Sequence, residues 1–239
     1  MKFLFGSFRQ PRLKKMVERD SYYSESYKDV MYSGFVGKIF RLSHIQMERN
    51  FRKSHFYGSV LELGATDITH FDYIRHGFND YLVTDIDSTS LNRNVFDALD
   101  HRIKVLALDA SDLSRFPNES FDRVIITCLI QHLQDPEKSL LEWRRICKKN
   151  GFISLYVHSE PGLLLRIGRY LTTYKKMKKL GLAHLDFVYD EHKIHYLAVK
   201  HLIRRVYSND EIKSQSFPFG LSWNFSLWKI FTIQKLNSM

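Results

Sequence analysis

The chain has 239 residues, of which 44% are hydrophobic, so we expect a single domain of the larger sort with a substantial core. Lysine and arginine exceed aspartate and glutamate by ten, and a net charge of +10 favours an anionic partner, whether nucleic acid, a lipid headgroup or a phosphate-bearing substrate. No run reaches the ~18 apolar residues of a membrane span, and Met1 to Phe5 is too short for a signal peptide, so we expect a cytoplasmic protein. Cys128 and Cys147 are expected in a buried strand and the following helix, as reduced thiols rather than a disulfide or a metal site.

Residues 1–57 are expected to form a helical extension ahead of the main domain. Apolar residues recur at helical intervals between Phe35 and Phe51, which predicts an amphipathic helix with Glu48 and several arginines on its surface. The apolar positions of this helix are Phe35, Ile39, Leu42, Ile45 and Phe51. From the residues alone, this is a helix that packs on the domain.

Two apolar runs, Val60–Thr66 and Tyr81–Asp87, are typical of buried parallel strands followed by loops. Between them, Ile68, Phe71, Tyr73 and Ile74 suit a crossover helix, which Gly77 with Asn79 and Asp80 would end. Gly64 lies 85 − 64 = 21 positions before Asp85, close to the ~20 that separate a nucleotide-binding loop from its ribose-binding carboxylate. Neither phosphate-binding glycine motif is present, so these residues predict a nucleoside site without a phosphate cradle.

Strands and helices continue to alternate after this unit, as a doubly wound sheet requires. Further strands are expected at Lys104–Leu108, Arg123–Leu129 and Phe152–Val157. Pro136 is expected to open a helix whose apolar face is Leu140, Leu141, Trp143 and Ile146. Asp109 follows the third strand, where it either borders the ligand or caps a turn at Ser111–Asp112. The chain ends with two β-rich runs, Ile212–Phe219 and Phe225–Leu236, that suit an antiparallel pair with Pro218 at a strand end or edge.

The segment Glu62-Leu63-Gly64 resembles the Glu/Asp-x-Gly-x-Gly signature of class I S-adenosylmethionine-dependent methyltransferases, and Asp85 is similar to the ribose-binding acidic residue of that family. The resemblance continues in the family's order and spacing to about Val157. The further matching segments are Leu108-Asp109-Ala110, Ser120-Phe121-Asp122-Arg123-Val124-Ile125-Ile126, Gln131-His132-Leu133-Gln134-Asp135-Pro136 and Lys149-Asn150-Gly151-Phe152-Ile153. The sequence departs from the family pattern where Thr66 replaces the second glycine, Gln131 a glutamate and Asn150 a proline.

The resemblance implies an α/β, Rossmann-like, doubly wound sheet of seven strands, mostly parallel with the last strand antiparallel, together with N-terminal helices and a helical lid insertion. It implies a methyltransferase domain over 58–239, in which 159–207 form the lid and contribute to acceptor binding, while the N-terminal helices border the acceptor pocket. It also implies that S-adenosyl-L-methionine is the cofactor. The residues expected to bind it are Glu62, Gly64, Ala65, Asp85, Ile86, Asp109, Ala110 and Thr127.

Residues 159–190 are least like a generic family member. Apolar side chains from Leu163 to Met177 fall on one helical face, while Arg166, Arg169, Lys176 and Lys179 lie away from it. This pattern fits either a lid helix packed on its own domain or a basic amphipathic helix that rests on an anionic membrane surface.

Histidines follow several predicted strands and are candidates for a general base, because an oxygen acceptor must lose a proton and histidine has an unperturbed pKa near ~6.5. His132 follows the fourth strand and is the first candidate; His195 lies on the expected lid and is the second, and His158 follows the fifth strand. Each also fits a structural histidine. A metal site at Glu191, His192 and His195 is set aside because His-x-x-His without a further ligand is a weak signal.

These features predict methyl transfer to a hydroxyl of a glycan or a phosphate-containing small molecule that is anionic in character, such as a lipid-linked saccharide made at the inner membrane face. Two alternatives stay open. The positive charge would also attract RNA, although the sequence has no RNA-binding module and no specific nucleic acid is expected. Thr66 and Gln131 also allow a degenerate methyltransferase fold that acts as a binding subunit.

Overall fold

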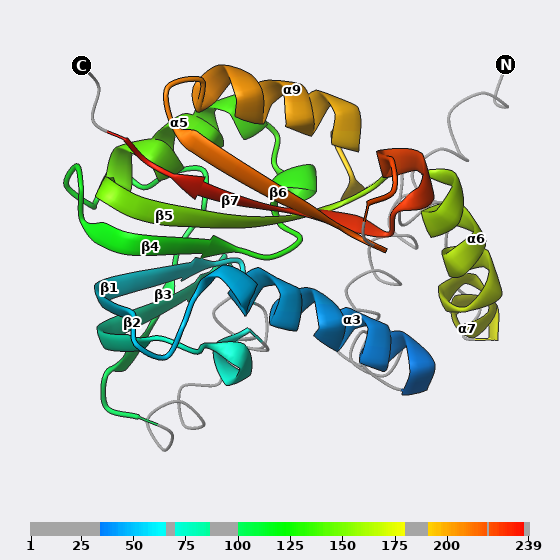
Figure 1. Cartoon of the computed structure of the whole chain (residues 1–239), viewed down its shortest axis with the longest axis horizontal. Helices are drawn as coiled ribbons and strands as arrows, with labels where there is room; N and C mark the ends of the chain where they lie inside the picture. The colour runs from blue at the N-terminus through cyan, green and yellow to red at the C-terminus, as the bar shows by residue number, and fades with distance from the viewer. Residues whose placement is uncertain (1–33, 66–69, 87–99, 180–190, 219, 237–239) are drawn as a thin grey trace, which may run out of the picture.

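The computed structural model describes residues 34–65, 70–86, 100–179, 191–218 and 220–236. The described residues contain a seven-stranded sheet whose strands are β1 (Phe56–Leu63), β2 (Gly77–Asp85), β3 (Ile103–Ala107), β4 (Phe121–Ile126), β5 (Cys147–His158), β6 (Glu211–Phe217) and β7 (Trp228–Gln234). The spatial order is β3-β2-β1-β4-β5-β7-β6, and β7 runs antiparallel to both its neighbours while the other six strands are parallel (Figure 1). The predicted fold class, including the antiparallel last strand, is confirmed.

Several predicted boundaries need correction. β2 begins at Gly77, so Gly77, Asn79 and Asp80 lie inside the strand and do not end a helix before it. The described part of the crossover is only the short 3-10 helix η3 (Phe71–Tyr73), and Ile68 lies outside the described residues. β4 ends at Ile126, three residues before the predicted end at Leu129. Pro218 does follow the end of β6, the edge strand of the sheet.

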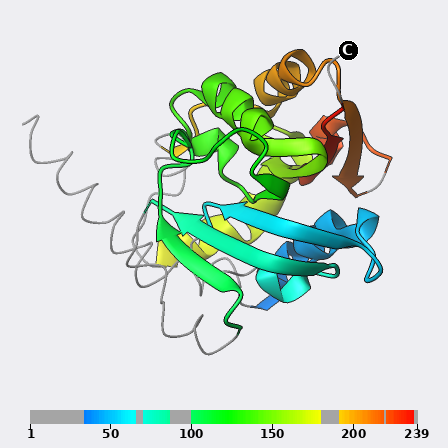
Figure 2. The ribbon, with the colours of Figure 1, turned by 90° about the vertical axis from the view of Figure 1, so that its left-hand side faces the viewer.

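Helices cover both faces of the sheet, as Figures 1 and 2 show. Helices α5 (Pro136–Ile146) and α9 (Tyr196–Val206) cover one face, where Trp143 and Ile203 join a fully buried apolar core with Leu61 and Leu63 of β1. Helix α3 (Gly34–Met47) covers the other face. Because successive side chains of a strand point to opposite faces, Val60 belongs to this second core.

The predicted start of helix α5 and most of its predicted buried face are confirmed. Asp135 accepts a hydrogen bond from the Lys138 backbone N–H at 3.0 Å and caps the helix, with Pro136 in the first turn. Leu140, Trp143 and Ile146 are buried as predicted, whereas Leu141 is exposed. The cysteines differ from their predicted places, since Cys128 lies after β4 and Cys147 begins β5. Both thiols are free.

The predicted apolar face of α3 is wrong at three of its five positions. Phe35, Leu42 and Ile45 are exposed, whereas Ile39 packs against the second core and Phe51, after the helix, is buried. The helix itself buries mostly small and polar residues. The buried residues of α3 are Val36, Gly37, Ser43, His44, Gln46 and Met47. Glu48, predicted on the surface, lies in the 3-10 helix η2 (Glu48–Asn50) that continues α3 and is fully buried.

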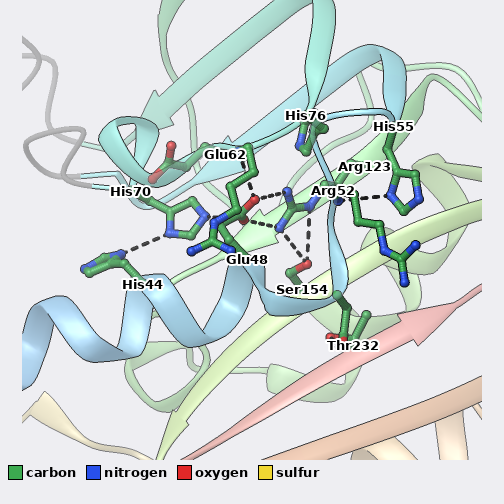
Figure 3. Close-up of polar contacts among 12 residues, drawn as sticks. His44, Glu48, Arg52, His55, Glu62, His70, His76, Arg123, Ser154 and Thr232 are labelled. Atoms are coloured by element: carbon green, nitrogen blue, oxygen red, sulfur yellow. Dashed lines mark hydrogen bonds and ion pairs between the residues drawn. The ribbon is translucent and has the colours of Figure 1, made fainter.

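A buried ion pair explains this inversion (Figure 3). Glu48 accepts hydrogen bonds from Arg123 of β4 at 3.0 and 2.5 Å, and its carboxylate also contacts His70 Nε2 at 3.0 Å. Arg123 is fully buried, bonds to Ser154 of β5, and its guanidinium lies 3.5 Å from the centroid of the Phe51 ring. Burial alone would raise the pKa of Glu48, but the charge and hydrogen bonds of Arg123, with the His70 hydrogen bond, hold it below its usual range. The pair therefore joins α3 to the middle of the sheet.

The region after β5 forms two helices, α6 (Leu163–Leu171) and α7 (Thr173–Lys179), with Thr172 between them. Four of its apolar side chains are largely exposed: Leu163, Ile167, Tyr170 and Leu171. Arg169, predicted to lie away from the packed face, is instead half-buried and forms an ion pair with Glu160. In the described part of the chain, no helix has the length and apolarity to cross a bilayer.

Candidate functional site

The carboxyl ends of the parallel strands lie on the side of the sheet where α6 and α7 are found (Figure 1). Strand register aligns the expected cofactor residues at this edge. Leu63 of β1 pairs with Thr84 of β2 and with Ile126 of β4. The next residue of each strand, Gly64, Asp85 and Thr127, therefore meets the others at one level of the edge. A ligand in a doubly wound sheet binds at this edge.

Gly64 has the backbone that the loop requires. Its φ is +67°, in the left-handed region where a side chain is strained. A Cβ placed there would also lie 3.0 Å from both methyl carbons of Leu129, which follows β4. Ala65 continues the turn, and its N–H donates to the Thr84 carbonyl at 2.9 Å. Leu129 therefore packs directly against the backbone of Gly64, in the space that a side chain would need.

The two acidic residues expected at the cofactor have different surroundings. Asp85 is the last residue of β2 and is buried, with 9% of its surface exposed, whereas Ile86 after it is highly exposed. Glu62 is buried inside the sheet, where its carboxylate accepts a hydrogen bond from the Tyr81 hydroxyl at 2.5 Å. Burial and the Glu62 charge raise the pKa of Tyr81 well above its usual value, which keeps the phenol a donor. Of the two carboxylates, Asp85 lies at the carboxyl end of its strand, whereas Glu62 is held inside the sheet by Tyr81.

The turn after β3 bears on the two roles predicted for Asp109, which were to border the ligand or to cap a turn. Its carboxylate accepts from the Ser111 N–H at 2.8 Å and from the Ser111 hydroxyl at 2.7 Å, so Asp109 caps this turn. Ala110 is buried, and its carbonyl accepts from the indole N–H of Trp143 at 3.0 Å. These bonds fix the turn beside β2, where the Leu108 N–H also donates to the Asp85 carbonyl at 2.8 Å.

Three histidines gather beyond the ends of β4 and β5. His132 ends the 3-10 helix η4 (Ile130–His132), and its ring centroid lies 4.7 Å from that of His192 in an edge-to-face arrangement. His192 also lies 6.1 Å from His158, the last residue of β5. Glu191 Oε2 lies 3.6 Å from His132 Nδ1. The cluster therefore brings together a strand end, a turn and the segment before α9.

The members of the cluster differ in access. His132 retains 31% exposure of its side chain, whereas His158 is buried between Tyr156 and Cys128, whose atoms lie 3.2 and 3.5 Å from its two ring nitrogens. Burial, with the positive charge of Arg169, lowers the pKa of His158 well below its usual value, so this ring stays neutral. His158 therefore fits a structural role, which was the alternative predicted for each of the three histidines.

His195, the second predicted catalytic residue, is exposed at the position before α9. His192 lies in its place in the cluster, and it was considered in the sequence only as a metal ligand. Its ring pairs with Glu160, which lies two residues after the end of β5 and also contacts Arg169. A carboxylate and a histidine 32 positions apart carry no motif, so only the fold could reveal this pair.

The described residues fit S-adenosylmethionine. Gly64 has no side chain and a left-handed backbone, Asp85 ends β2, and strand register puts Thr127 at the same level. Two buried polar atoms near the histidines, Gln131 Nε2 and Ser159 Oγ, have no hydrogen-bond partner in the part of the chain that the structure describes. Buried groups of this kind are normally satisfied by a ligand or by water. Within the described ranges, no three side chains of histidine, cysteine, aspartate or glutamate are placed so that they could hold a metal ion.

Comparison with known proteins agrees with this geometry. Residues 61–155 match a family described as a methyltransferase domain. The fold is similar to an O-methyltransferase family protein from Burkholderia thailandensis, with a TM-score of 0.63 at 9% identity over 96% of this chain and 68% of that one. It is also similar to a SAM-dependent methyltransferase from Archaeoglobus fulgidus, with a TM-score of 0.57 at 13% identity over 87% and 98% of the two chains.

A third similar structure contains ligands. It is the 1,6-didemethyltoxoflavin-N1-methyltransferase of Burkholderia thailandensis with bound 1,6-didemethyltoxoflavin and S-adenosylhomocysteine, which has a TM-score of 0.60 at 12% identity over 98% of this chain and 92% of that one. At these identities the structural likeness concerns the fold. No sequence match was found among curated proteins.

Proposed function

We propose that this chain, an S-adenosylmethionine-dependent methyltransferase, transfers the methyl group to a hydroxyl of a sugar or of a phosphate-containing small molecule. The observation that carries the proposal is the histidine cluster, because His158 contacts the Cys128 thiol at 3.5 Å, one residue after Thr127, and so connects the candidate bases to the ends of β4 and β5. A sulfonium methyl has a good leaving group, so positioning and exclusion of water are most of what the protein must supply. A hydroxyl acceptor additionally needs a base.

The cofactor residues are proposed with separate roles. Asp85 would accept hydrogen bonds from the ribose hydroxyls, while Gly64 and Ala65 would present backbone to the ligand. Ile86 would contact the adenine from its exposed position after β2. Asp109 and Ala110 would shape the turn beside it, and Thr127 would border the methyl end. Glu62 would contribute indirectly, from inside the sheet, through its hydrogen bond with the Tyr81 hydroxyl.

An anionic acceptor is supported by the net charge of +10 and by the basic residues of α6 and α7. From Pro161 to Lys179 the sequence has six lysines and arginines and no acidic residue. In glycan synthesis, the anionic acceptor would be a soluble or a lipid-linked saccharide. RNA is the competing anionic acceptor, and it is therefore one of the acceptors to be tested.

Peripheral contact with an anionic membrane is part of the proposal. Exposed Leu163, Ile167, Tyr170 and Leu171 accompany the basic residues of α6 and α7 on the side of the molecule that holds the site. Apolar side chains with basic neighbours suit the interface of an anionic bilayer. Sedimentation with vesicles of phosphatidylglycerol should deplete the protein, and vesicles of phosphatidylcholine alone should not. Equal loss to both would contradict the preference for anionic lipid, and loss to neither would contradict membrane contact.

Calorimetry with S-adenosylhomocysteine tests the cofactor site. Asp85→Ala should weaken binding roughly tenfold or more, because charge-assisted hydrogen bonds to the ribose would be lost. Asp80→Ala is the matched control, since Asp80 lies in the same strand but is exposed and pairs with Lys104. Absence of binding in the unmodified protein, or equal affinity in both variants, would overturn the assignment of the site.

The acceptor is then sought with labelled methyl donor against nucleotide sugars, lipid-linked saccharides and RNA. Transfer to a saccharide hydroxyl supports the proposal. Transfer to RNA alone would replace it with the competing function, and no transfer to any acceptor despite cofactor binding would favour the binding-subunit alternative.

A further inference from the structure

The short segment before α9 holds His192 against the end of β5. The Lys193 N–H donates to the Gln131 carbonyl at 2.7 Å, and the Tyr196 N–H donates to the Glu160 carbonyl at 3.0 Å. Backbone bonds on the C-terminal side of His192 therefore fix this segment to η4 and to the turn that follows β5. His192 is consequently placed by the fold, with 12% of its side chain exposed.

Glu160 orients the His192 ring. Its carboxylate contacts His192 Nδ1 with one oxygen and Arg169 of α6 with the other. Glu160 is 6% exposed, and its guanidinium partner favours the ionised form. An ionised carboxylate accepts hydrogen bonds only, so Nδ1 must carry the proton. In a neutral ring, Nε2 then keeps its lone pair and is available to accept a proton.

We propose that His192 is the general base for the acceptor hydroxyl and that Glu160 is its positioning residue; this inference rests on the proposed methyl transfer. The hydroxyl proton passes to His192 Nε2 as the oxygen forms a bond to the methyl carbon. The carbon–sulfur bond breaks, and its electron pair stays on sulfur. The products are a methyl ether and S-adenosylhomocysteine, and the imidazolium, paired with Glu160, later releases its proton to water.

The surroundings of His192 keep its ring neutral, so it is present in the form that can take up a proton. Burial, with the charges of His132 and Arg169, lowers the pKa of His192 to about 3, so the ring is neutral at pH 7. Among the described residues, the titratable groups that face His192 come from several elements. They are His132 of η4, Glu191 and His195 of the segment before α9, His158 at the end of β5, Glu160 after it, and Arg169 of α6. An acceptor that is already a good nucleophile at pH 7 would need no such base, and the pair therefore points to a hydroxyl rather than a carboxylate.

The tautomer of His192 gives a test that needs no acceptor. Protein with ¹⁵N-labelled histidine, saturated with S-adenosylhomocysteine, is examined by NMR at pH 7, and His192→Gln identifies the signals. We expect a neutral ring protonated at Nδ1, and Glu160→Gln should shift the ring toward the Nε2 tautomer. A charged ring, an Nε2-protonated ring, or no response to Glu160→Gln would overturn the proposal. Cofactor binding is measured in the same samples, so failure of the proposed function is seen separately.

Kinetics provide the second test once the screen has supplied an acceptor. His192→Gln should lower kcat by about 10²- to 10⁴-fold while the dissociation constant of S-adenosylhomocysteine stays unchanged. Glu160→Asp should retain more activity than Glu160→Gln, because it keeps a carboxylate beside the ring. The control is His101→Gln, whose side chain is 94% exposed. A large loss in His132→Gln with His192→Gln unaffected would transfer the role of base to His132.

Discussion

Replacing the buried carboxylate of Glu48 tests whether the Glu48–Arg123 pair holds α3 on the sheet. Glu48→Gln keeps the shape but leaves the Arg123 guanidinium, which is fully buried, without a counter-charge. Removing one partner of a buried pair typically costs about 3–5 kcal/mol, because the remaining charge is desolvated and unpaired. Since whole domains have a free energy of unfolding of only about 5–15 kcal/mol, this variant should lose a large part of its stability.

The measurement is urea unfolding at pH 7, followed by circular dichroism and tryptophan fluorescence. The same loss should lower the melting temperature by roughly 6–20 °C, at about 2–4 °C per kcal/mol for a chain of this size. Asp80→Asn is the matched control, because it breaks the exposed ion pair with Lys104 and should cost about 0–1 kcal/mol.

The double variant Glu48→Leu with Arg123→Met separates charge from packing. Because both charges are removed together, it should be more stable than Glu48→Gln, although the contact of Arg123 with the Phe51 ring is lost. A cost below about 1 kcal/mol for Glu48→Gln, or a double variant as unstable as the sum of the two single changes, would refute this account of the pair.

Three further changes test other parts of the structure. Gly64→Ala should cost about 1–2 kcal/mol of stability, because a side chain is strained at φ +67° and would meet Leu129; it should also weaken S-adenosylhomocysteine binding, which calorimetry would detect. Tyr81→Phe should cost about 1–3 kcal/mol in urea unfolding, because the buried Glu62 carboxylate loses a donor. Burial, with the charge of His70, lowers the pKa of His44 from 6.5 to about 3, so stability present above pH 6.5 should fall as the pH drops toward 3, and His44→Gln should flatten this dependence in unfolding experiments at several pH values.

The alignment of Gly64 with Asp85 was predictable because the residues that determine it are local. Strand β1 ends at Leu63 and β2 at Asp85, so in a parallel β-α-β unit the glycine after the first strand and the carboxylate at the end of the second lie at the same side of the sheet. The short apolar runs identify the strands directly, since a central parallel strand is buried on both faces, as Val124, Ile125 and Ile126 are.

The position of α3 was not predictable in the same way. Periodicity assigns a helix face from its apolar residues, yet α3 approaches the sheet through His44, Gln46 and the following Glu48. The reason is a partner 75 positions away, since Arg123 looks like an ordinary surface charge until β4 is placed in the centre of the sheet. A long-range polar pair leaves no periodic signal in either segment.

The substitution of glutamine at position 131 bears on whether the site is degenerate. Gln131 Oε1 accepts from the His158 N–H at 2.9 Å, and its backbone carbonyl accepts from Lys193 N–H, so this residue joins β5 to the segment that carries His192. A glutamate would keep the same acceptor but would add a buried negative charge beside the histidine cluster. Glutamine preserves the connection without that charge, and it leaves one amide donor for a ligand. The departure from the family pattern is therefore compatible with a working site, and it directs attention to the acceptor rather than to the loss of activity.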